Sequence, residues 1–185
     1  EMQATEVRFP SQFDQEQART LMESIAASDD SAGVTIFTSG GSIPSAIKQV
    51  YDDYGLFETE VVQLRWSDYL DDLEDRDLPV FVLTWIADGP DPVSFLRSLF
   101  HSDSPNNYSG YSNDQVDELL NQAMVEQDNE RRAELVREAH RLILESAVVM
   151  PLYHGVDHML VASHVNGLKT TPMGILGLET VWIEQ

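Results

Sequence analysis

The chain has 185 residues, 42% of them hydrophobic, and a formal net charge of -21 at pH 7 with only two lysines, Lys48 and Lys169. This length can bury one sizeable core, so the composition predicts one globular α/β domain and not a disordered chain. The negative charge argues against nucleic acid and anionic membrane surfaces as partners and favours cations and cationic ligands. No apolar run reaches the ~18 residues that a membrane helix needs.

The composition also bears on the protein's environment. An acidic, lysine-poor surface keeps a protein soluble in high salt, so a salt-adapted source and an ordinary acidic secreted protein are both considered. The lack of cysteine excludes disulfides and thiolate metal sites but does not identify the compartment. Because the chain begins at Glu1 without Met or an apolar signal segment, we expect a trimmed fragment whose targeting signal lay upstream.

The first half of the chain alternates amphipathic helices with short apolar strands, which predicts parallel strand pairing. Helices are expected at 13–27, after the loop at 38–42, and after 67, and strands at 34–37, 61–64 and 79–85. The side chains expected to face inward are Ala18, Leu21, Met22 and Ile25, then Ile43, Ala46, Ile47 and Val50, then Tyr69, Leu70 and Leu73, with Asp14 and Ser67 as helix caps.

Three further helices are predicted in the second half. Asp91-Pro92 is a typical helix start, Ser112 and Gln115 fit a capping box, and Asp128 fits a third cap. A strand is expected at 148–153, and the Gly- and Pro-rich tail at 166–177 leads to a last apolar strand. The side chains expected to face inward are Phe95, Leu96, Leu99 and Phe100, then Val116, Leu119, Leu120, Ala123 and Met124, then Leu135, Val136, Ala139, Leu142 and Ile143, and the last strand holds Trp182 and Ile183.

The segment W-I-A-D-G-P-D-P, from Trp85 to Pro92, leads the third expected strand into a loop that bears carboxylates. Such a layout suits a ligand-binding mouth. Asp88 either pairs with a cationic ligand group or shapes an Asp-Gly turn. Trp85 either offers an aromatic surface to a ligand or packs into the core at the end of the strand.

Three other arrangements carry weaker signals. His154 and His158 have a spacing that could bind zinc on a helix, but they follow Pro151 and no third ligand is evident, so no metal site is expected. The loop at 40–42 could cradle an anion, yet it lacks the lysine of a nucleotide loop and is interpreted as a plain connection. A hydrolase using Asp88 with Asp91 is the enzyme alternative, and a stand-alone interaction module is the other.

Several motifs follow one another along the chain. They are F-D-Q-E-Q-A-R-T-L-M from Phe13, W-I-A-D from Trp85, D-P-V-S-F-L from Asp91, N-Y-S-G-Y-S-N from Asn107, V-D-E-L-L from Val116, D-N-E-R-R from Asp128, V-M-P-L-Y-H from Val149, and V-N-G from Val165. In this order they resemble the extracellular solute-binding proteins of family 5, which deliver peptides, nickel and similar solutes to ABC importers. The resemblance covers nearly the whole chain from Phe13 onward.

The resemblance implies an α/β lobe of the periplasmic-binding-protein type II kind, with a mixed sheet flanked by helices. Residues 1–164 would form the C-terminal ligand-binding lobe of a two-lobe protein, and residues 165–185 would return toward a missing N-terminal lobe. The two lobes would close on an extracellular solute, most simply a peptide, and the closed form would be recognised by a membrane ABC permease. The resemblance implies an extracellular or periplasmic location, with a lipid anchor left open, and no cofactor, metal or catalytic residue.

In dipeptide- and oligopeptide-binding relatives, the aspartate of the W-x-A-D motif pairs with the free α-ammonium group of the ligand. Asp88 stands at that position in this sequence, and Trp85, Ala87 and Gly89 complete the ligand-binding set that the resemblance implies. Gly89 and Pro90 depart from the aromatic and polar residues that peptide binders often carry here. The ligand class therefore stays open, with a peptide or another amine-bearing solute as the first expectation.

Overall fold

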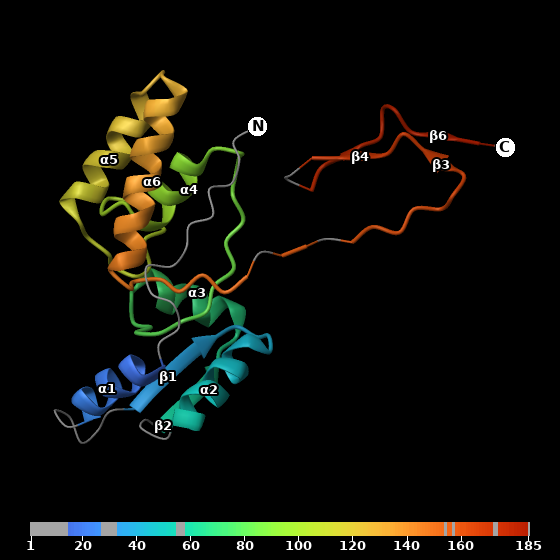
Figure 1. Cartoon of the computed structure of the whole chain (residues 1–185). Helices are drawn as coiled ribbons and strands as arrows, with labels where there is room; N and C mark the ends of the chain where they lie inside the picture. The colour runs from blue at the N-terminus through green and yellow to red at the C-terminus, as the bar shows by residue number, and fades with distance from the viewer. Residues whose placement is uncertain are drawn as a thin grey trace.

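The computed structural model describes residues 15–26, 33–54, 58–153, 155–156, 158–171 and 174–184. Helices and strands are mixed along the chain, as predicted for an α/β protein (Figure 1). The helices are α1 (Gln15–Ala26), α2 (Ile43–Tyr54), α3 (Trp66–Glu74), α4 (Pro92–Phe100), α5 (Asp114–Val125) and α6 (Asn129–Glu145), and the strands are β1 (Gly33–Thr38), β2 (Glu58–Gln63), β3 (Val165–Asn166), β4 (Lys169–Thr170), β5 (Leu176–Gly177) and β6 (Trp182–Ile183).

The first two strands pair in parallel, as predicted. Ile36 of β1, which is fully buried, lies opposite Val61 of β2. The strand predicted at 79–85 is wrong in extent, because among the described residues it pairs with β1 only at a single parallel bridge between Phe37 and Phe81. β1 ends at Thr38, whose hydroxyl bonds to the backbone of Gly40, so within the described residues the segment at 83–85 has no strand beside it.

The apolar faces predicted for the first two helices are only partly buried. Leu21 and Ile25 of α1 and Ala46 and Val50 of α2 are exposed, although these helices lie on either side of β1 in Figure 1. The two-stranded sheet of the described chain does not cover these positions, so these inward assignments are wrong. The predicted Asp14 cap and the side chain of Met22 lie outside the described part of the chain.

Helix α3 packs as predicted but begins differently. Arg65 occupies the N-cap position without a side-chain hydrogen bond, so the predicted Ser67 cap is wrong; the Ser67 hydroxyl contacts Asp68 instead. Tyr69 and Leu73 are fully buried. The Tyr69 hydroxyl donates a 2.9 Å hydrogen bond to the carbonyl of Val82, which ties α3 to the extended segment beside β1.

Burial raises the pKa of Tyr69 to about 12. The unfolded chain therefore releases this proton more readily than the folded one between pH 10 and 12, so the free energy of unfolding should fall as the pH rises through this window. We expect Tyr69→Phe, which has no proton to release, to flatten this part of the profile in urea titrations from pH 9 to 12. Tyr153→Phe, at an exposed position, is the control, and equal alkaline slopes in the two variants would contradict the expectation.

Helices α4, α5 and α6 pack against one another and form most of the core (Figure 1). Asp91 and Asp128 cap α4 and α6 as predicted, whereas α5 is capped by Asn113, one residue after the predicted Ser112. The Asn113 side-chain oxygen accepts from the backbone N–H groups of the second and third helical residues. The predicted inward residues pack here, except Met124, which is half exposed. The main buried cluster consists of Leu96, Phe100, Val116, Leu120, Ala139 and Ile143, and a second one of Val93, Ala123 and Leu135.

The strand predicted at 148–153 is not formed. Val148 and Val149 pack against the helical core, but Met150 to Tyr153 are exposed and have no strand partner among the described residues.

The last predicted strand is confirmed as β6, which pairs antiparallel with β3, while β4 pairs antiparallel with β5. Figure 1 shows these short pairs extending away from the helices. The strands of the described chain thus form separate two-stranded sheets and not one continuous mixed sheet. The helices that the structure describes are each too short or too polar to cross a membrane.

Candidate functional site

The segment that the sequence singled out is a loop held at both ends, here called the Asp88 loop (residues 83–90). At its start, the bridge between Phe37 and Phe81 and the hydrogen bond from Tyr69 to Val82 fix the backbone. At its end, Asp91 caps helix α4. No hydrogen bond joins the residues between these two anchors to the rest of the described chain.

Burial alternates along the Asp88 loop. Trp85, Ala87 and Gly89 are half-buried, whereas Asp88 is exposed and Ile86 is 79% exposed. The four predicted site residues are near neighbours in the sequence and share this loop, with the Asp88 carboxylate facing solvent and forming no ion pair within the described chain. A Cβ built on Gly89 would meet no atom within 4 Å, so the backbone at this position is open to close approach.

The Asp91 carboxylate is fully engaged in the fold. One oxygen accepts from the backbone N–H of Val93 at 3.2 Å and from Nη2 of Arg132 at 2.8 Å, and the other accepts from the Ser94 hydroxyl at 3.0 Å. Burial alone would raise the pKa of Asp91, but these hydrogen bonds and the Arg132 charge outweigh it and lower the pKa. Asp91 is therefore a cap and ion-pair partner, and the geometry offers no free second carboxylate for the acid–base pair of the hydrolase alternative.

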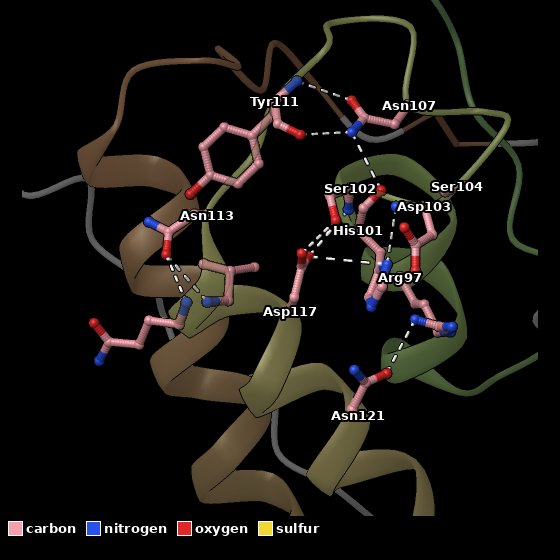
Figure 2. Close-up of polar contacts among 12 residues, drawn as sticks. Arg97, His101, Ser102, Asp103, Ser104, Asn107, Tyr111, Asn113, Asp117 and Asn121 are labelled. Atoms are coloured by element: carbon pink, nitrogen blue, oxygen red, sulfur yellow. Dashed lines mark hydrogen bonds and ion pairs between the residues drawn. The ribbon is translucent and has the colours of Figure 1, made fainter.

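Beside these helices, a polar loop at 101–113 is fixed by side-chain hydrogen bonds (Figure 2). Asn107 is 1% exposed, and its amide nitrogen donates to the carbonyls of His101 and Tyr111 at 3.2 and 2.7 Å. Its amide oxygen accepts from the Tyr111 N–H at 3.1 Å and from the Ser109 hydroxyl at 3.0 Å. One buried amide therefore joins His101, at the start of the loop, to Tyr111 near its end.

Asp117 of α5 anchors the start of the same loop. Its carboxylate accepts from both the backbone N–H and the hydroxyl of Ser102, and Figure 2 shows it pointing toward His101 as well. Sequence reasoning did not find these structural roles, although Asn107 and Asp117 lie within motifs that it quoted. The only signal was the dense run of Ser, Asn and Asp between two apolar helices, which predicts a turn but not its hydrogen bonds.

The structure also bears on the weaker candidate sites, which are the histidine pair and the loop at 40–42. His154 lies outside the described residues, and within the described ranges no three His, Asp or Glu side chains are grouped as metal ligands. Gly40 and Gly41 both have positive φ values and connect β1 to α2. A shallow depression of about 470 Å³ lies at the α5–α6 connection, lined by Gln122, Val125, Glu126, Gln127, Arg131 and Leu135, and does not include the Asp88 loop.

Known proteins resemble this chain in sequence and in fold. No family model matches the sequence. The chain is 27% identical over 126 residues to the oligopeptide-binding protein OppA of Bacillus subtilis, and the match covers 68% of this chain and 23% of that protein. Its curated relatives are family 5 peptide-binding proteins, and the chain is similar to part of their length.

Solved structures show the same fold. The structure of HbpA2 from Haemophilus parasuis superposes with a TM-score of 0.83 at 21% identity, over 98% of this chain and 38% of that one. The ABC transporter-associated periplasmic binding protein DppA from Helicobacter pylori, solved with the peptide STSA, gives a TM-score of 0.72 at 24% identity, over 95% of this chain and 36% of that one. The α/β lobe of the periplasmic-binding-protein type is thus confirmed.

These relatives are described as binding proteins and not as enzymes. This chain spans about a quarter of the curated family 5 relative and just over a third of the superposed structures.

Proposed function

We propose that this chain is the C-terminal ligand-binding lobe of a two-lobe solute-binding protein that captures a peptide or a related amine-bearing solute for an ABC importer. The observation that carries the proposal is the Asp88 carboxylate. It is exposed, has no ion-pair partner in the described chain, and lies on a loop whose two ends are fixed. Such a carboxylate is free to pair with a ligand.

The chemistry of this carboxylate favours a cationic ligand group. A carboxylate that faces an ammonium group in a closed cleft forms charge-assisted hydrogen bonds worth roughly 1.5 to 3 kcal/mol each. The half-buried ring of Trp85 offers an apolar surface three residues away, and the open backbone at Gly89 allows a ligand main chain to approach. The peptide named with the Helicobacter pylori structure supports peptides as the first solute class.

The C-terminal part of the chain supports a second lobe as partner. Many large apolar side chains are exposed along the segment at 150–184, here called the C-terminal arm, which an isolated soluble protein rarely presents. The arm contains one Lys or Arg residue, Lys169, and three of the 32 acidic residues. It is therefore much less negatively charged than the rest of the chain. We propose that the arm packs against the N-terminal lobe: its first part, up to residue 164, ends the C-terminal lobe at 1–164, and residues 165–185 form the return segment. The exposed apolar residues of the arm include Met150, Leu152, Tyr153, Val156, Met159, Leu160, Ile175, Leu178, Trp182 and Ile183.

In this proposal the ligand bridges two lobes, and contacts on both sides stabilise the closed form. The closed surface would be recognised by a membrane ABC permease, which places the protein outside the cell or in the periplasm. The Asp88 loop lies on an open surface in this chain because it would supply only one wall of the cleft.

Native mass spectrometry of the parent protein, purified from its own source, tests the proposal. We expect a chain longer than 185 residues that carries a bound peptide or amine-bearing solute, and saturable binding of that solute without turnover. A natural chain of this length with nothing bound would refute the two-lobe receptor and favour a stand-alone interaction module. Steady conversion of the bound solute would instead support an enzyme.

A further inference from the structure

Arg132 joins three parts of the fold at the end of the Asp88 loop. Its Nη2 lies 2.8 Å from the Asp91 carboxylate, and its Nε donates at 3.0 Å to the carbonyl of Ala123 in the last turn of α5. Arg132 itself lies in the first turn of α6. A single guanidinium therefore connects the N-terminus of α4, the C-terminus of α5 and the start of α6.

The apolar residues beneath this bridge are tightly packed. Val93, Ala123 and Leu135, one from each of the three helices, form a buried cluster in the same region. The side chains of the bridge are 32% and 30% exposed, so solvent screens it somewhat more weakly than the Arg141–Glu138 pair of α6, whose side chains are 47% and 42% exposed. A planar guanidinium can donate to a carboxylate and a carbonyl at once, which a lysine ammonium cannot do with the same fixed geometry.

We propose that Arg132 is a positioning residue for the ligand site, because it fixes Asp91 and thereby the end of the Asp88 loop. The loop has no other hydrogen bond to the described chain between Val82 and Asp91, so its position depends on these two ends. Arg132 does not touch the ligand in this scheme. Its effect on binding is transmitted through Asp91 and the two residues between Asp91 and Asp88, Gly89 and Pro90, and this effect rests on the function proposed above.

The mobility of the loop is measured first, in the full-length protein without ligand. This chain has no cysteine, so Ile86→Cys, at an exposed loop position, gives one spin-label site within it. We expect Arg132→Gln to shorten the rotational correlation time of the label by about twofold or more. Asp91→Asn should do the same, since asparagine keeps the helix cap but loses the charge of the bridge.

Arg131→Gln is the matched control, because Arg131 lies in the same turn of α6 and pairs with Glu134 instead of Asp91. The second measurement compares the affinities for a dipeptide and for its N-acetylated form. If Arg132 positions Asp88, Arg132→Gln should reduce this discrimination by about fivefold or more, whereas Arg131→Gln should not. Arg132→Lys keeps the positive charge but not the planar guanidinium, so its discrimination between the dipeptide and the N-acetylated form should lie between those of Arg132→Gln and the original protein.

The outcomes separate the two proposals. Unchanged label mobility in a folded Arg132→Gln protein would overturn the positioning role, whatever the ligand. Increased mobility in a protein that binds peptide with unchanged discrimination would also overturn it. Increased mobility in a protein whose unmodified form binds no peptide would support the Arg132 bridge as the anchor of the loop and refute the proposed peptide-binding function.

Discussion

Replacing Asp88 by asparagine in the full-length protein is expected to weaken the binding of a peptide with a free α-ammonium group by about tenfold or more. Asparagine keeps the shape of the side chain but removes its charge, so the charge-assisted hydrogen bond to the ligand becomes a neutral one. The Asp88 loop should otherwise be unchanged, because Asp88 makes no ion pair with the described chain and faces solvent. Isothermal titration calorimetry on both proteins measures the difference.

Two controls make the Asp88 result specific. Asp77→Asn removes an exposed carboxylate outside the loop, and it should leave the affinity unchanged. An N-acetylated peptide, which has no ammonium group, should bind the original protein and Asp88→Asn about equally. Equal affinities of the two proteins for the free-amine peptide would remove Asp88 from the site.

The parts of the fold that could be predicted from sequence are those whose packing partners lie within the described chain. Helices α4, α5 and α6 bury their apolar faces against one another, so residues such as Leu120 and Ile143 lie where helical periodicity predicts. The capping carboxylates Asp91 and Asp128 were also predicted, since a cap depends only on its own first turn. In α4, α5 and α6, the caps and the apolar periodicity therefore predict the same helices that the packing stabilises.

The failed predictions of burial share another cause. Leu21, Val50 and the residues at 150–153 are apolar at positions that periodicity marks as buried, yet they are exposed. In the two-lobe protein proposed above, these side chains would be covered by segments that this chain, which spans 38% of a structure that it superposes on, does not contain. The apolar run at 79–85 fails for a local reason, because β1 ends at Thr38 and offers this run only one bridge within the described chain.

The candidate site could be located from sequence but not assembled from it. A strand-to-helix segment with Asp88 and Asp91 is visible as a motif, and the cap explains why Asp91 precedes Pro92. The partner of Asp91 could not be found in this way, because Arg132 is 41 positions away and is one of four arginines in a helix that also holds four glutamates. Long-range polar contacts of this kind depend on the packing of three helices.

Replacing Asn107 by alanine is expected to destabilise the protein by about 3 kcal/mol, the largest stability effect expected of a single polar residue here. The substitution removes all four hydrogen bonds of a side chain that is 1% exposed. The carbonyls of His101 and Tyr111 and the N–H of Tyr111 then lose their partner, and burying unpaired groups costs more than the bonds contribute when formed. Urea denaturation followed by circular dichroism measures the loss.

Asn121→Ala provides the matched asparagine control, because Asn121 is exposed and accepts a single hydrogen bond from Arg97. We expect it to cost no more than about 0.5 kcal/mol. Asn107→Asp separates donor from acceptor: the carboxylate can still accept from Tyr111 and Ser109, but it would face two carbonyls that need a donor, so it should destabilise the protein strongly at pH 7. If Asn107→Ala and Asn121→Ala cost the same, the loop at 101–113 is held by its backbone turns and not by the buried amide.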